Sequence, residues 1–192
     1  YERIILEAFP NVHKVKCIPH ADGVHWLVPG NVLIVVFPDL KNKNAMDPLQ
    51  PKVDANTISR ITAYIQDRTG KQVTVKVKNP GYQKVKLDFK VKFYDKYEFN
   101  YYREQLKQEL IQFLSPWAFK TDYDISFGGK VYKSVVLDFV EEREYVDYIT
   151  DFKMYTYTGE TASTNDMGVA QTERPDAILV SAETHEINKT ET

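Results

Sequence analysis

The fold is decided by a stretch of strict alternation, which reads Val85-Lys86-Leu87-Asp88-Phe89-Lys90-Val91-Lys92-Phe93. Apolar side chains occupy the odd positions and charged side chains the even ones, and a β-strand gives this period of two. We therefore expect a strand with one buried face and one wet face. Lysines dominate the wet face, but the formal net charge of −2 for the whole chain argues against a nucleic-acid stripe. A solvated sheet face that discourages edge pairing is the better interpretation.

Two helices are predicted after this strand. Residues 98–114 carry apolar side chains at helical spacing, and Ser115-Pro116 ends that helix. Residues 125–127 indicate a short strand, which Gly128-Gly129 breaks. Apolar side chains then recur at three and four residues over 131–140, which predicts the second helix.

The remainder of the chain predicts a long strand, a loop and a final strand. The long strand covers 145–157, and small or polar residues at 158–175 predict a flexible loop. Four side chains of the long strand are expected on one face: Val146, Tyr148, Phe152 and Met154. Strand character returns at 177–181.

The first part of the chain has its own helices and strands. Residues 1–78 read as helix, strand, strand, helix and strand, and the apolar run 32–37 is typical of a central strand buried on both faces. Asn79-Pro80-Gly81 is the best internal boundary, so we expect one domain at 1–79 and another at 80–192. The fold class is α+β. Each domain is interpreted as a small ferredoxin-like α/β sandwich, with helices on one face of a mixed or antiparallel sheet.

The composition of this 192-residue chain excludes several classes of protein. The charges nearly balance, so no basic footprint for nucleic acid is visible, and no apolar run is long enough to span a bilayer. The single cysteine, Cys17, excludes an internal disulfide. The chain opens at Tyr1 on a helical run, so we expect a longer protein, with the first strand of the first unit and everything before it missing here.

Few residue combinations could carry chemistry. Cys17, His20 and His25 lie close together, but a zinc site needs three or four ligands, and a fourth would have to come from His13, Asp22 or a distant residue. A loop with ordinary histidines is therefore the preferred interpretation. No phosphate-binding motif surrounds Gly128-Gly129, which with Pro116 we interpret as structural turn residues. Paired carboxylates fall in turns or on wet strand faces. We therefore predict no catalytic, cofactor-binding or metal-binding residues, and a protein that is not an enzyme.

An ordered set of segments carries a resemblance to a known family. The segments are Asn79-Pro80-Gly81-Tyr82, Phe113-Leu114-Ser115-Pro116-Trp117, 124–134, Tyr145-Val146-Asp147-Tyr148-Ile149 and 175–187. In this order they resemble the C-terminal part of baseplate J-like proteins, wedge components of contractile phage tails and of phage-tail-like contractile injection systems. The resemblance implies a structural role, because wedge subunits join into a ring around the central spike and hub.

Expectations about partners follow from the resemblance and from the abundance of tyrosine, which is enriched at interfaces. The expected interface residues are Tyr97, Tyr101, Tyr102 and Trp117. The expected partners are other baseplate wedge subunits and further copies of the chain, with no cofactor, nucleic acid, membrane insertion or small-molecule substrate. We expect synthesis in the cytoplasm and incorporation in a phage tail or phage-tail-like particle. The alternative is a peptide- or glycan-binding module that uses the exposed tyrosines.

Overall fold

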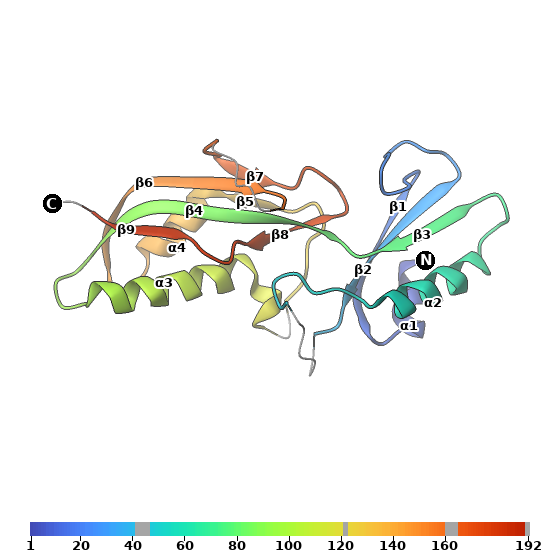
Figure 1. The fold of residues 1–192 in the computed structure, drawn as a ribbon, viewed down its shortest axis with the longest axis horizontal. Coiled ribbons are helices and arrows are strands. Elements are labelled where there is room, and N and C mark those ends of the chain that lie inside the picture. Colours follow the sequence, from blue (N-terminus) through green and yellow to red (C-terminus); the bar gives the residue numbers. More distant parts are fainter. Residues whose placement is uncertain (41–46, 121–122, 160–164, 191–192) are drawn as a thin grey trace. The chain divides into compact units, whose positions relative to one another are not determined.

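The computed structural model describes most of the chain as two compact units (Figure 1). The described residues are 1–40, 47–120, 123–159 and 165–190. The first unit comprises Tyr1–Gly81 together with Arg174–Ile178, and the second comprises Tyr82–Glu173 together with Leu179–Thr192. The chain therefore passes from one unit to the other three times. A short segment near the C-terminus belongs to the first unit, although it is almost a hundred residues away from the rest of that unit.

The first unit is built on a three-stranded mixed sheet. Its elements are α1 (Glu2–Ala8), β1 (Val12–Pro19), β2 (Asn31–Pro38), α2 (Ala55–Gln66) and β3 (Thr74–Lys78). The order of helices and strands agrees with the sequence prediction. Strand β2 is central, antiparallel to β1 and parallel to β3. Its five middle residues are all buried, which confirms the prediction of a central strand covered on both faces.

Both helices of the first unit contribute to one hydrophobic core. Ile5 of α1 and Ile61 and Ile65 of α2 join a cluster with alternate residues of β2 and β3. The start of α2 is fixed locally, because the carboxylate of Asp54 accepts a hydrogen bond from the Thr57 amide at 2.9 Å. That interaction lowers the pKa of Asp54 from its usual range.

The ferredoxin-like detail of the prediction is not confirmed. In a split βαβ unit another strand lies between the two parallel strands. Here β2 and β3 pair directly, with Val32 opposite Val75 and Ile34 opposite Val77. The α+β class and the placement of helices on a mixed sheet are confirmed, while the strand order differs.

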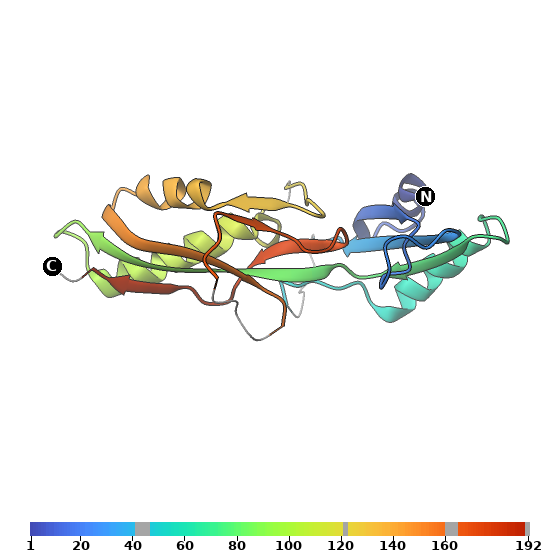
Figure 2. The same cartoon turned by 90° about the horizontal axis from the view of Figure 1, so that it is seen from above.

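The second unit contains a larger mixed sheet with β4 at its centre (Figure 2). Its elements are β4 (Gly81–Phe93), α3 (Phe99–Leu114), the 3₁₀ turn η1 (Pro116–Ala118), β5 (Lys130–Tyr132), α4 (Lys133–Glu141), β6 (Val146–Tyr157), β7 (Val169–Gln171), β8 (Ala177–Ser181) and β9 (Glu186–Lys189). Strand β4 pairs with β6 in antiparallel and with β9 in parallel orientation. Its other neighbour is β8, whose first two residues, Ala177 and Ile178, belong to the segment assigned to the first unit. Strands β5 and β7 form a separate two-stranded sheet.

The alternation of β4 organises the core of this unit. The five odd-numbered side chains from Val85 to Phe93 are all buried and belong to one cluster with residues of both α3 and α4. Both helices therefore pack on the same face of β4. They also contact each other, since the rings of Phe113 and Phe139 stack with centroids 4.2 Å apart. Burying each such apolar side chain contributes about 1.5–3 kcal/mol.

Two details of the second unit differ from the sequence predictions. The predicted strand at 125–127 is wrong: Ile125 is buried without belonging to a strand, and β5 begins only at Lys130. Its partner β7 lies inside the segment predicted as a loop, of which 160–164 fall outside the described residues. Strands as short as β5 and β7 form only because they pair with each other, and a pairing between distant segments leaves no local pattern in the sequence.

The faces of β6 were also predicted incorrectly. Val146 and Met154 are buried as expected, but Tyr148 points to the exposed face. The pairing with β4 shifts register twice, and Asp151 at one shift has a positive φ of 53°. An extra residue in one strand reverses the alternation beyond it, and these irregularities move Tyr148 to the outside.

A buried histidine joins β4 to the end of the chain. His185 has 2% of its surface exposed, and its Nδ1 accepts a hydrogen bond from the Leu87 amide at 3.2 Å. The proton of the neutral ring therefore resides on Nε2, which lies 3.0 Å from Ser181 Oγ. Burial, followed by repulsion from Lys86 and Lys107, lowers the pKa of His185 to about 4.

This histidine predicts a loss of stability in acid. In the unfolded chain the imidazole takes up a proton near pH 6.5, but in the folded chain only near pH 4. The part of the free energy of unfolding that depends on neutral His185 is therefore fully present above pH 6.5. It falls by about 3 kcal/mol as the pH drops to 4. Urea unfolding at a series of pH values measures the loss.

The control separates His185 from all other titrating groups. His185→Asn keeps an oxygen that can accept the Leu87 amide and does not titrate, so its stability should change less between pH 6.5 and 4 than that of the unchanged protein. His13→Asn, the same change at an exposed position of β1, is the matched substitution, because it leaves the buried imidazole and its hydrogen bond to Leu87 in place. Equal pH dependence in His185→Asn and the unchanged protein would contradict the assignment.

Candidate functional site

The wet face of β4 is a ladder of ion pairs. Each lysine of this face, including Lys84 just before the alternating stretch, has an acidic partner: Lys84 with Glu183 at 3.2 Å, Lys86 with Glu186 at 3.0 Å, Lys90 with Asp151 at 3.0 Å and Lys92 with Asp147 at 3.7 Å. The acidic residues come from β6 on one side and from the C-terminal segment on the other. The lysine charges are therefore largely compensated within the chain, and the face does not present a basic stripe.

The second feature is an aromatic group at the start of α3, which we call the tyrosine cluster (Tyr97, Tyr101, Tyr102 and Tyr145). The ring of Tyr102 contacts the other three, with centroids 4.7 Å from Tyr97, 5.0 Å from Tyr101 and 5.0 Å from Tyr145. Tyr145 is buried, whereas Tyr101 has 66% of its surface exposed. The cluster thus extends from the core of the second unit to its surface.

Two polar interactions hold the tyrosine cluster in place. The Glu98 carboxylate caps α3 by accepting hydrogen bonds from the amides of Tyr101 at 2.7 Å and Asn100 at 3.0 Å, which lowers the pKa of Glu98. The Tyr145 hydroxyl donates to Glu109 at 2.9 Å. Burial and this hydrogen bond raise the pKa of Tyr145 far above its usual range. Tyr145 is therefore a neutral, fixed ring against which the partly buried rings of Tyr97 and Tyr102 pack.

The other predicted interface residue lies elsewhere. Tyr97, Tyr101 and Tyr102 are brought together, but Trp117 follows the opposite end of α3 in η1. The 16 residues of α3 separate the two ends of the helix by about 24 Å. Of the predicted turn residues, Pro116 is buried at the start of η1, and Gly128 has a positive φ of 71°, which favours glycine. A Cβ at Gly129 would lie 3.4 Å from the Ser126 carbonyl oxygen.

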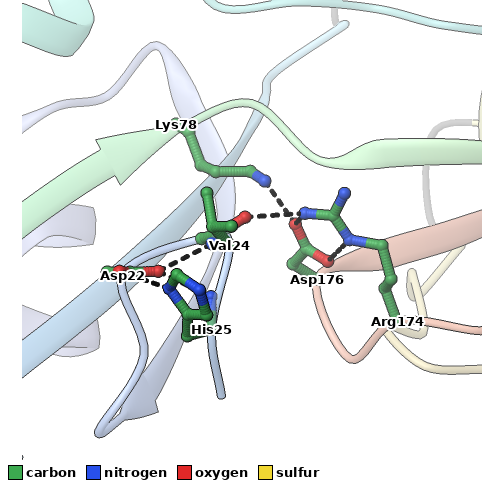
Figure 3. A network of polar contacts seen from close by, with 7 residues as sticks. Asp22, Val24, His25, Lys78, Arg174 and Asp176 are labelled. Atoms are coloured by element: carbon green, nitrogen blue, oxygen red, sulfur yellow. Dashed lines mark hydrogen bonds and ion pairs between the residues drawn. The ribbon is translucent and has the colours of Figure 1, made fainter. Parts of the chain in front are cut away.

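The third feature is a buried carboxylate in the first unit, which sequence reasoning missed. Asp176 is fully buried and forms ion pairs with Lys78 and with Arg174 (Figure 3). The Arg174 guanidinium uses two nitrogens, Nε at 3.0 Å and Nη2 at 2.9 Å. The backbone carbonyl of Asp176 also accepts the amide of Gly81 at 3.1 Å. We call these contacts the Asp176 clasp, because they attach the returning segment to the end of β3.

The Asp176 clasp extends to the loop between β1 and β2. Arg174 Nη2 donates to the Gly23 carbonyl at 3.0 Å, and its guanidinium carbon lies 5.4 Å from the centre of the Trp26 ring. Within the loop the Asp22 carboxylate accepts the amides of Val24 and His25, both at 2.7 Å (Figure 3). These hydrogen bonds hold the pKa of Asp22 well below its usual range. The loop is therefore ordered by contacts near and far in the sequence.

The residues considered as metal ligands are used differently. The Cys17 amide donates to the Glu2 carboxylate at 2.7 Å, while His25 Nδ1 lies 3.1 Å from Asp22. Burial raises the pKa of the Cys17 thiol. Within the described residues, no three His, Cys, Asp or Glu side chains are grouped as a metal ion would require. In the same part of the chain, no helix has the length and apolar character needed to cross a membrane.

Comparison with protein families identifies the kind of protein. A profile of the family described as "Baseplate protein PVC11-like" matches residues 3–183. The chain belongs to the PVC11-like baseplate protein family. The expectation of a baseplate component of a phage-tail-like contractile system is thereby confirmed.

A solved structure shows the same fold as this PVC11-like protein. It is a chain of the anti-feeding prophage (AFP) baseplate, determined by cryo-EM with 6-fold symmetrisation, with a TM-score of 0.65 and 18% sequence identity. The match covers 95% of the present chain and 36% of the other, so the PVC11-like chain spans little more than a third of that relative. A comparison with curated proteins finds no match.

The Asp176 clasp predicts a specific loss of stability in this PVC11-like chain. Asp176→Asn leaves Lys78 and Arg174 without a counter-charge, and both reach water only in part. We expect the free energy of unfolding to fall by about 2–4 kcal/mol, somewhat less than for a wholly buried pair. Chemical denaturation of the purified chain measures this change.

An exposed ion pair supplies the matched control. Glu7 pairs with Arg3 at 2.7 Å on the surface of α1, so Glu7→Gln should cost about 0.5 kcal/mol or less. Similar losses for Asp176→Asn and Glu7→Gln would show that the clasp contributes no more than a surface pair.

Proposed function

We propose that this PVC11-like protein is a non-enzymatic wedge subunit that assembles with neighbouring wedge subunits and further copies of itself around the central spike. In this proposal the exposed side of the tyrosine cluster is the contact surface. Family membership supports a baseplate role, and the observation that carries the proposed interface is the ordered, exposed ring of Tyr101, which contacts the partly buried Tyr102, which in turn contacts the buried Tyr145.

The geometry of the cluster suits protein recognition. Tyrosine presents a large, rigid surface and a hydroxyl group at little cost in conformational entropy, and it is enriched among residues that dominate binding energies. Here the rings are fixed by edge contacts and by the cap of α3 before a partner arrives. A surface that is already ordered loses less entropy when it binds.

The strongly perturbed groups of the second unit support a structural role. His185 and Tyr145 are both buried, and each is bonded to a fixed partner, the Leu87 amide and Glu109 respectively. Their shifted pKa values thus follow from packing and burial. The proposal further includes synthesis of the protein in the cytoplasm and its incorporation into the particle. It includes no binding of nucleic acid, no membrane insertion and no small-molecule substrate.

The tyrosine cluster gives a direct test. Tyr101→Ala in the full-length protein should weaken its complex with a co-expressed neighbouring baseplate subunit by about 10-fold or more, because loss of a hot-spot tyrosine costs about 2 kcal/mol or more and about 1.4 kcal/mol corresponds to 10-fold. Size-exclusion chromatography and a binding titration of the purified pair measure the effect.

Tyr132→Ala is the matched control, because Tyr132 is also an exposed tyrosine but lies on β5, outside the cluster. It should leave the affinity within about 2-fold. If the full-length protein co-elutes with no baseplate subunit, the wedge proposal is wrong. Saturable binding of a peptide or glycan by the isolated chain, lost in Tyr101→Ala, would instead favour a binding module.

A further inference from the structure

The loop between β1 and β2 presents apolar side chains to solvent. Leu27 has 90% of its surface exposed and Val24 has 69%, and Trp26 lies between them in the sequence. Single exposed apolar residues are common on proteins. What distinguishes this case is that two exposed apolar side chains and a tryptophan share one short turn, which we call the apolar tip (Val24, Trp26 and Leu27).

The backbone beneath the apolar tip is held by several hydrogen bonds. The Val28 amide donates to the His20 carbonyl at 2.7 Å, and the Asp22 amide donates to the His25 carbonyl at 3.2 Å. The Asp22 carboxylate fixes two further amides, those of Val24 and His25. Gly23 has a φ of 90°, a conformation that favours glycine and lets the chain reverse sharply at this point.

The same loop is anchored from the other end of the sequence. Arg174 contacts both the Gly23 carbonyl and the Trp26 ring, and its guanidinium is itself oriented by the buried carboxylate of Asp176. Burying a carboxylate is costly unless cations compensate it. The Asp176 clasp is therefore a buried charge network that holds this loop in place, although the side chains of Val24 and Leu27 on the loop are mostly exposed to solvent.

We propose that the apolar tip is a preordered docking element that inserts into an apolar pocket of another protein subunit of the particle. This inference rests on the proposed assembly role and names a second contact surface, in the first unit. An ordered tip loses little entropy on insertion, and a large apolar side chain that becomes fully buried in a pocket is the usual form of a binding hot spot.

Charge favours a protein pocket over a lipid surface. The two cations of the Asp176 clasp, Lys78 and Arg174, are both paired with Asp176, and Asp22 of the loop adds a further negative charge. Loops that insert into anionic membranes rely on uncompensated Lys and Arg around the apolar residues. Here the local charges balance, so burial of Val24 and Leu27 against apolar side chains is the main source of affinity.

The test uses the full-length protein in assembled particles. A photo-crosslinking amino acid placed at position 27 should give a crosslink to one different baseplate subunit. Leu27→Asp should reduce incorporation into particles by about 10-fold, because a charge cannot enter an apolar pocket without a counter-ion. Val135→Asp, the same change at an exposed valine of α4, should leave incorporation within about 2-fold.

A second variant and a lipid control complete the experiment. Leu27→Ser should also reduce incorporation, and thermal unfolding should show both Leu27 variants folded, because this side chain is almost wholly exposed. Vesicles of equal parts phosphatidylglycerol and phosphatidylethanolamine should not co-sediment the protein.

Several results would overturn the inference. They are a crosslink only to another copy of the chain, a crosslink to no protein in particles that contain the chain, equal losses for Leu27→Asp and Val135→Asp, or vesicle binding that Leu27→Asp abolishes. If the unaltered full-length protein is absent from particles altogether, the proposed assembly role fails first. If it is present and position 27 contacts no other subunit, the docking element alone is wrong.

Discussion

The second unit depends on the burial of one face of β4. Its five inward side chains from Val85 to Phe93 form the surface on which both helices pack, and its backbone pairs with strands that come much later in the sequence. Burial of this face fixes the register of the strand, because a slip by one residue would place every lysine in the core. The ion-pair ladder on the opposite face then follows from that register. Individually such exposed pairs contribute little, so the apolar face decides the fold.

The helices and strands that could be predicted from the sequence are those with a local signal. The apolar run 32–37, the alternation in β4 and the helical spacing in α3 each contain their own periodicity, and the structure places these elements close to the expected residues. The errors arise where a distant partner decides. Ile125 is apolar because it is buried in the core, but it does not belong to a strand. Strand β7 forms because β5 pairs with it.

The same distinction between local and distant contacts applies to the candidate sites. The tyrosines near the start of α3 could be found because Tyr97, Tyr101 and Tyr102 lie close together in the sequence at the predicted helix start, and the structure brings their rings into contact. Tyr145, which completes the cluster, could not, since its contact depends on tertiary packing. Arg174 lies in the predicted loop 158–175, and Asp176 lies between that loop and the predicted strand 177–181. Their role appears only when residues about 150 positions apart are brought to the same loop, as with Arg174 and Gly23.

The return of 174–178 to the first unit has a consequence for how such proteins can vary during evolution. A gene segment ending after Gly81 would encode most of the first unit but would lack both Arg174 and Asp176, so Lys78 would lose its counter-charge and the Gly23 carbonyl its donor. Exchange of either unit between related proteins therefore needs two matched exchange points, one near Gly81 and one around the returning segment. Recombination at a single point would combine the β1–β2 loop of one protein with a returning segment that evolved with the loop of another protein.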